Sequence, residues 1–162
     1  MARLATLVAA LALALAAQQD DGLNRLGLPN PPKQDVPFLI HGSELRELEQ
    51  AEASEEEAKN QLRYWIAGAA AGIKTPLAAP EFLFDSHEID PRNLELYGFE
   101  VVKGRREILY RKKKKVVAEP YFLNLEGIEG RVVRIRINAS LAPGEYGITP
   151  QGRNTVFTFA VF

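Results

Sequence analysis

From Glu81 to the carboxyl terminus, apolar side chains recur at every second position in short runs separated by turn residues. In Arg131–Asn138, valine and isoleucine alternate with arginine and asparagine, as expected of a strand with one buried face. Thr155–Phe162 is apolar at both alternating sets of positions, which is typical of a strand inside a sheet. Short strands without intervening helical periodicity predict an all-β fold, an antiparallel sandwich or barrel.

We expect about eight to ten short strands. The runs that carry this pattern are Val36–His41, Gln61–Ile66, Glu81–Asp85, Leu94–Val102, Arg106–Arg111, Tyr121–Glu126, Arg131–Asn138, Tyr146–Thr149 and Thr155–Phe162. A Lys103-Gly104 pair between two of these runs predicts a tight β-hairpin. Ala67–Pro80 is rich in small residues, glycine and proline, and we interpret it as a loop that crosses between sheets.

Ser43–Asn60 is compatible with two structures. Its Glu, Ala, Leu and Lys content favours a helix, and Ser54-x-x-Glu57 matches a capping box. Its apolar positions form only a thin stripe, however, and the alternating run that follows it has the pattern of a return strand. We favour a hairpin, with a short helix in the connection as the alternative.

Met1–Ala16 has the three parts of a cleavable secretory signal helix. Arg3 supplies the positive charge, Leu4–Leu15 is apolar apart from one threonine, and Ala14-Leu15-Ala16 offers small residues for cleavage. A membrane-spanning helix needs roughly 20 apolar residues, and this run is shorter. We therefore expect a secreted or periplasmic protein with no membrane span in its mature chain.

The remaining chain divides into a lead-in and one domain. Residues 17–35 are polar and proline-rich, so we expect a flexible or extended segment rather than a helix or strand. Residues 36–162 fit a single β-sandwich domain. The chain has no cysteine, which excludes disulfides, thiol catalysis and cysteine metal sites. Stability must therefore come from the core.

A turn near the carboxyl terminus resembles a known motif. Leu141-Ala142-Pro143-Gly144-Glu145-Tyr146 is similar to the L-x-P-G-x-Y turn of Ig-like and related β-sandwich domains in exported bacterial proteins. A looser similarity to uncharacterised domains of this kind covers most of the mature chain. The resemblance implies an Ig-like sandwich in which the Tyr146 hydroxyl bonds back to the preceding backbone, a tyrosine corner. It implies no activity.

A concentrated run of positive charge is the most unusual local feature. Its residues are Arg105, Arg106, Arg111, Lys112, Lys113, Lys114 and Lys115. In a hairpin they would form a basic strip along one strand and its exit loop, and Arg131, Arg134 and Arg136 would extend it if their strand lay nearby. The strip has two interpretations: a surface that binds anions, or an edge strand whose lysines prevent aggregation.

Negative charge elsewhere in the chain bears on how this strip is interpreted. The Glu-rich segment Glu44–Glu57 could neutralise it, either within the protein or across a homo-oligomer. With Lys+Arg 20 against Asp+Glu 21, the bulk charge gives no indication of a nucleic acid, and the basic run lacks interleaved aromatic residues. The expected partners are an extracytoplasmic protein or an acidic polymer. The sequence does not assign an oligomeric state.

Catalytic and metal-binding candidates are weak. Asp85, His87 and Asp90 could hold a divalent cation, but we favour a polar loop that ends at Pro91. His41 and Ser43 lack the surroundings of a nucleophile elbow, and we interpret Ser43 as a turn or cap residue.

The sequence thus favours an exported, non-enzymatic β-sandwich module that binds or scaffolds another extracytoplasmic component, with the basic strip or an exposed sheet edge as the contact. No cofactor is expected. The alternative is a secreted carbohydrate-active or metal-dependent enzyme that uses Asp85, His87 and Asp90.

Overall fold

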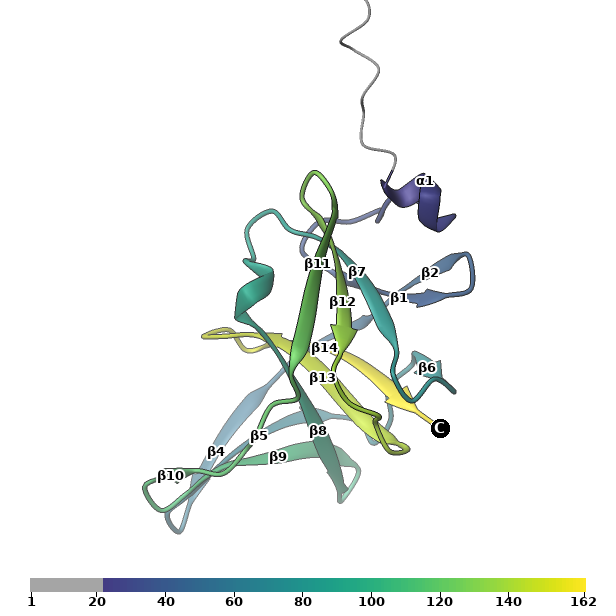
Figure 1. Ribbon diagram of the computed structural model, residues 1–162. Coiled ribbons are helices and arrows are strands. Elements are labelled where there is room, and N and C mark those ends of the chain that lie inside the picture. The colour runs from purple at the N-terminus through teal and green to yellow at the C-terminus, as the bar shows by residue number, and fades with distance from the viewer. Residues whose placement is uncertain (1–21) are drawn as a thin grey trace, which may run out of the picture.

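The computed structural model describes residues 22–162, which form two β-sheets packed as a sandwich (Figure 1). The proposed signal Met1–Ala16 lies outside the described residues. All strand pairs are antiparallel except the short β6–β14 pair. The prediction of an all-β antiparallel sandwich is confirmed, but residues 22–162 contain 14 strands rather than eight to ten.

The first sheet has five strands in the order β11-β12-β7-β1-β2. Their bounds are β1 Pro37–His41, β2 Glu44–Glu47, β7 Glu81–Asp85, β11 Leu123–Glu129 and β12 Val132–Ile137. The central strand, β7, is buried on both faces, since Phe82, Leu83 and Phe84 are all inaccessible to solvent. The sequence predicted the bounds of this strand, Glu81–Asp85, correctly.

The second sheet follows the order β3-β14-β13-β8-β9-β5-β4, with β6 paired to β14 and β10 paired to β9. Its strands are β3 Glu49–Glu52, β4 Ser54–Ala58, β5 Gln61–Ala67, β6 Lys74–Thr75, β8 Leu94–Val102, β9 Arg105–Lys112, β10 Lys115–Val116, β13 Gly144–Pro150 and β14 Thr155–Val161. The last strand, β14, lies between β3 and β13, as its two apolar faces predicted.

Most of the strands beyond the expected number come from Ser43–Asn60 and from two-residue pairings. Ser43–Asn60 contains three strands and no helix: β2 borders the first sheet, and β3 and β4 border the second. Leu48, 1% exposed, anchors the crossing between the sheets. The abundant glutamates lie at sheet edges, where charged side chains prevent edge-to-edge association. Their helix propensity is overridden by this edge position.

The main core fills the space between the sheets. Phe82 of the first sheet and Phe159 of the second have ring centroids 5.1 Å apart. The buried members are Leu39, Leu48, Phe82, Phe84, Ile89, Leu94, Leu96, Ile135, Ile137, Leu141, Tyr146, Ile148, Phe157, Phe159 and Val161. Side chains of β8, β13 and β14 that alternate with these core residues therefore face away from the first sheet.

The lead-in contains a helix that the sequence did not predict. α1, Gly22–Leu26, sits at the end of the sandwich nearest β1 and β11 (Figure 1). Its Leu23, together with Leu28, packs against Leu83 and Val132 on the outer face of the first sheet. Two leucines of a segment that is mostly polar residues and proline carry this contact, and that composition gave no helical pattern. No described helix has the length and hydropathy to cross a membrane.

Two turns follow the sequence closely. Lys103 and Gly104, with φ of 50° and 79°, join β8 to β9 as the predicted hairpin. Tyr146 Oη donates a hydrogen bond to the carbonyl oxygen of Ala142 at 2.7 Å. The expected bond from this tyrosine to the preceding backbone is therefore present.

Candidate functional site

The β8–β9 hairpin opens into a fork, and residues of both strands line a groove on the second sheet. The two strands pair over only three positions, from Glu100↔Glu107 to Val102↔Arg105. Beyond these, β8 turns to pair with β13, while β9 continues along β5 and pairs with β10. Where β8 has left β9, Tyr121 donates its backbone N–H to Leu96 O of β8 at 2.8 Å.

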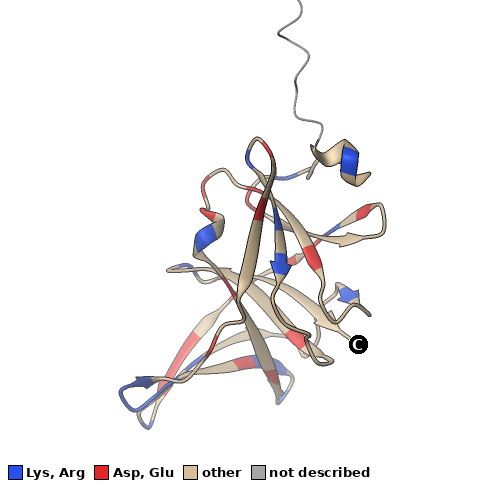
Figure 2. Cartoon of the chain, in the orientation of Figure 1, with Lys and Arg blue, Asp and Glu red and all other residues tan. Residues whose placement is uncertain are grey.

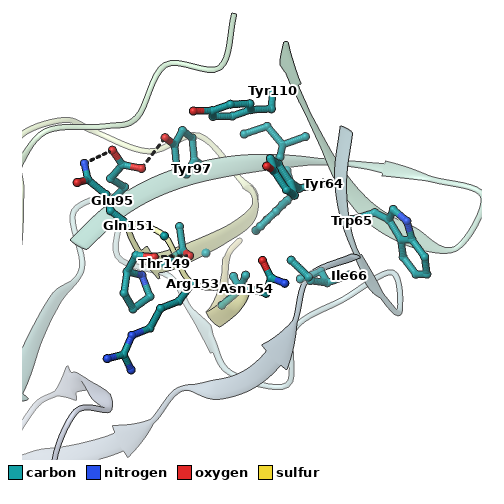
Figure 3. A pocket seen from close by; sticks show the side chains of 17 residues that line it. Tyr64, Trp65, Ile66, Glu95, Tyr97, Tyr110, Thr149, Gln151, Arg153 and Asn154 are labelled. Atoms are coloured by element: carbon teal, nitrogen blue, oxygen red, sulfur yellow. Dashed lines mark hydrogen bonds between the residues drawn. The ribbon is translucent and has the colours of Figure 1, made fainter. Parts of the chain in front are cut away.

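A groove of about 550 Å³ lies on the face of the second sheet that is turned away from the first sheet. Its walls come from β5, β8, β9, β13, β14 and the β13–β14 turn (Figure 3). Since β5 and β14 line the same groove although three strands separate them, the sheet curves around it. The lining residues are Ala53, Tyr64, Trp65, Ile66, Glu95, Tyr97, Phe99, Ile108, Tyr110, Gly147, Thr149, Pro150, Gln151, Gly152, Arg153, Asn154 and Val156.

The floor of the groove depends on Gly147. A Cβ atom at this position would lie 2.6 Å from Phe99 Cε2 and 2.6 Å from Val156 Cγ1. Glycine therefore lets the Phe99 ring lie close to β13. Any larger residue would force Phe99 or Val156 to shift, and both side chains line the groove.

Three tyrosines form the aromatic side of the groove. Tyr64 and Tyr110 have ring centroids 5.3 Å apart at an interplanar angle of 73°, and Tyr97 lies beside them (Figure 3). The ladder between β5 and β9 shifts at this point: consecutive Leu62 and Arg63 pair with Arg111 and Leu109, which leaves Tyr110 as the extra residue of a β-bulge. Bulges re-aim side chains, and this one lies next to the groove.

Glu95 organises the polar side of the groove. It accepts hydrogen bonds from Tyr97 Oη at 2.8 Å and from Gln151 Nε2 at 2.7 Å, one on each carboxylate oxygen (Figure 3). Burial, and then the bond to Glu95 and its charge, raise the pKa of Tyr97 well above its ordinary value. The phenol is thus held as a protonated donor. Exposed Arg153 and Asn154, on the β13–β14 turn, add further polar groups.

A second hollow, also of about 550 Å³, is lined partly by the segment that follows β10. It shares Tyr97 and Ile108 with the groove. Glu107, 5% exposed, borders it and accepts hydrogen bonds from Arg63 at 3.2 Å and Arg105 at 2.9 Å.

The structure divides the predicted basic strip into paired arginines and exposed lysines. Arg105 forms an ion pair with Glu56 and lies over the Trp65 ring, 5.0 Å from its centroid. Arg111 forms an ion pair with Glu57. The Glu-rich segment therefore neutralises part of the strip within the protein, which was one of the expected alternatives.

Arg106 does not belong to any surface strip. Its side chain is 2% exposed and donates to the carbonyl oxygens of Gly68 at 3.1 Å and Ala67 at 3.2 Å. It also forms an ion pair with Glu145 at 3.6 Å. Its inclusion in a partner-binding strip was wrong, because alternation along β9 turns it to the opposite face from Arg105.

The lysines collect where two hairpins end side by side. Lys113 donates its backbone N–H to Asn60 O at 2.5 Å, which joins the β9–β10 turn to the β4–β5 turn. We call the exposed set on these turns the basic tip; it comprises Lys59, Lys112, Lys113, Lys114 and Lys115. Figure 2 shows the blue residues gathered at this end of the molecule, beside β10.

Arg131, Arg134 and Arg136 do not extend this tip. The latter two lie on β12 of the first sheet. Both pair with Glu81, and Arg136 also pairs with Glu126.

The predicted metal alternative lies in the connection after β7. Asp90 caps the short 3₁₀ helix η1, Pro91–Asn93, and binds the Arg92 side chain at 2.6 Å. Exposed His87 donates its backbone N–H to Asp35 Oδ1 at 2.8 Å. The structure does not bring the side chains of Asp85, His87 and Asp90 together, and across residues 22–162 no three His, Asp or Glu side chains form a group that could hold a metal ion.

Ser43 lies in the exposed turn between β1 and β2, as the sequence predicted. The groove itself was not predicted. Tyr64, Tyr97 and Tyr110 stand on strands in the sequence, but only the fork, the bulge and the sheet curvature bring them together.

Comparison with known proteins gives no guide to the groove's ligand: no protein-family model, curated protein or solved structure matches the chain.

Proposed function

We propose that this protein is a non-enzymatic binding module whose groove holds a short stretch of oligosaccharide. The observation that carries the proposal is the pairing of an aromatic side, Tyr64, Tyr97 and Tyr110, with a polar side organised by Glu95. The groove volume of about 550 Å³ falls within the range of small-molecule sites.

Saccharide chemistry matches both sides of the groove. A sugar ring has an apolar C–H face, which packs on tyrosine rings, and a rim of hydroxyls, which need planar donors and acceptors. Gln151, Arg153 and Asn154 offer amide and guanidinium groups at the polar side. A small number of placed polar groups within an apolar lining gives orientation as well as affinity.

A binding role is favoured over hydrolysis by the state of Glu95. Among the described residues that line the groove, it is the only one with a carboxylate, and both its oxygens already accept hydrogen bonds. Glycosidases of the usual kind use two carboxyl groups that flank the scissile bond. Glu95 is thus suited to fixing Tyr97 and Gln151 in place.

Export is part of the same proposal. The Met1–Ala16 sequence supports delivery to the periplasm or the exterior, where glycans are abundant. The Tyr146–Ala142 bond supports a relationship with Ig-like sandwiches.

Glycan-array binding of the purified protein tests the proposal. We expect binding to a defined set of oligosaccharides and its loss in Tyr64→Ala and Tyr110→Ala. The matched control is Phe122→Ala, which removes an aromatic residue that is 82% exposed and absent from the groove lining. Equal binding by all variants, or no glycan binding by the wild type, would contradict the proposal. Cleavage of a bound glycan would replace it with a hydrolase function.

A further inference from the structure

The basic tip carries more positive charge than its surroundings neutralise. Of the ion pairs formed by residues 22–162, none involves Lys59 or Lys112–Lys115, whereas Arg111 beside them is paired with Glu57. The β4 glutamates Glu56 and Glu57 form ion pairs with Arg105 and Arg111 instead of with these lysines. The lysine ammonium groups are left to solvent.

Apolar side chains are exposed directly beside these lysines. Val116 is 58% exposed and Val117 is 44% exposed, although valine is ordinarily buried in strands. Val116 pairs with Arg111 through β10, and Val117 donates its backbone N–H to Tyr110 O at 2.8 Å. Both valines are therefore held in place at the surface by the backbone of β9.

We propose that the basic tip, with Val116 and Val117, docks the protein onto an anionic lipid surface. Lysines next to exposed apolar side chains match the boundary of a bilayer, where phosphate groups border acyl chains. An acidic polysaccharide would engage the lysines but has no place for two valines. The valines are the reason for choosing a lipid surface over such a polymer.

The shape of the tip suits this contact. Two hairpin turns, tied by the Lys113–Asn60 hydrogen bond, present the five lysines from one end of the second sheet (Figures 1 and 2). The groove begins further along the same strands, since Tyr110 is adjacent to Arg111 and Tyr64 lies on β5. Docking through the tip would hold the groove close to the membrane surface.

Co-sedimentation with vesicles of phosphatidylcholine, with and without phosphatidylglycerol, tests the proposal. We expect binding only when phosphatidylglycerol is present, and weaker binding at high salt. Replacing Lys112–Lys115 with serine should weaken binding at least tenfold, because each lysine near an anionic surface contributes roughly a fivefold change. The matched control removes four exposed charges elsewhere: Arg25, Arg46, Lys74 and Arg131, each changed to serine.

The apolar part of the contact needs its own measurement. Since the chain has no cysteine, Val117→Cys provides a unique attachment point for an environment-sensitive dye. Its emission should shift to the blue on phosphatidylglycerol vesicles, while the same dye at Leu77→Cys, a residue 47% exposed after β6, should not respond.

Three outcomes would overturn the proposal. These are equal loss of binding in the scattered-charge control, an unresponsive dye at position 117, and binding to acidic polysaccharide without binding to vesicles. The result is independent of the groove, because the lysine variant should retain glycan binding and Tyr64→Ala should retain vesicle binding.

Discussion

Arg106 and Glu145 form an ion pair inside the second sheet, with Nη1 of the arginine 3.6 Å from Oε2 of the glutamate. Their side chains are 2% and 13% exposed. The glutamate also accepts a hydrogen bond from the backbone N–H of Ala71 at 2.8 Å. The pair thereby ties β9, β13 and the loop after β5 together on the face of the sheet that carries the groove.

Arg106→Ala should therefore destabilise the fold far more than Arg105→Ala. Loss of the buried guanidinium leaves Glu145 without its cation and two carbonyl groups without donors, at a cost of about 3 kcal/mol. The neighbouring Arg105 is 28% exposed, and its partner Glu107 keeps a hydrogen bond from Arg63, so its loss should cost much less. Urea unfolding of both variants measures the difference, and equal losses would show that the buried pair has no structural role.

Asp35 should make stability depend on pH in the acid range. Partial burial opposes its ionisation, but hydrogen bonds from the backbone N–H groups of Glu88, His87 and Ile89 outweigh this effect and lower its pKa below 3.8. Because the folded state favours the carboxylate, its contribution is complete above the pKa of the unfolded chain. It is lost as the pH falls below about 4.

Asp35→Asn tests this pH dependence with little backbone perturbation. Asn tolerates the positive φ of 58° that Asp35 adopts, and it keeps a neutral acceptor. We expect a loss of about 1 kcal/mol at pH 7, less than the roughly 1.5–3 kcal/mol of a bond to a charged group, because the site is partly solvated. The gap to wild type should narrow as the pH approaches 3. A constant gap across this range would contradict the assignment.

The sequence predicted the sandwich well where burial on one or two faces sets the pattern. β7 and β8 have the predicted bounds, and the Lys103-Gly104 turn and the interior position of β14 follow directly from residue type. Prediction was harder at the sheet edges. In Ser43–Asn60, glutamate is favourable both at an exposed sheet edge and in a helix, so local propensity could not decide between strands and a helix.

The candidate site was less predictable because it depends on pairings between distant strands. Nothing near Tyr110 in the sequence signals that β8 leaves β9 after three pairs or that a bulge re-aims this tyrosine. Likewise, charge spacing on β9 suggested one continuous strip. Only the alternation of its faces, together with the glutamates of β4, separates Arg106 and Arg111 from the lysines.

Tyr97 should resist deprotonation in the folded protein. Burial, followed by its bond to Glu95 and the charge of that group, raises its pKa. Because the folded state holds this proton more tightly than the unfolded chain does, its contribution to stability is complete below about pH 10 and is lost at higher pH. Ultraviolet titration should show one fewer late-titrating tyrosine in Tyr97→Phe. Loss of an early-titrating one would contradict the geometry.

Gly147→Ala should disturb the packing of the side chains at the floor of the groove. The new Cβ would lie 2.6 Å from Phe99 Cε2 and Val156 Cγ1, so these two side chains, which both line the groove, must shift. The backbone of Gly147 has no positive φ, and the loss therefore reflects crowding rather than strain. Forcing extra volume into a packed site costs about 1–3 kcal/mol, which thermal unfolding measures.

Comparing Gly147→Ala with a matched control variant distinguishes an effect on stability from an effect on glycan binding. Gly127→Ala, on β11, adds a Cβ with nothing within 4 Å and should change stability by less than about 0.5 kcal/mol. At temperatures where both variants are folded, Gly147→Ala should bind the array's glycans weakly and Gly127→Ala should bind them as wild type does. If Gly147→Ala loses stability but keeps full binding, the ligand does not enter the space above Phe99. The groove would then be excluded as the saccharide site.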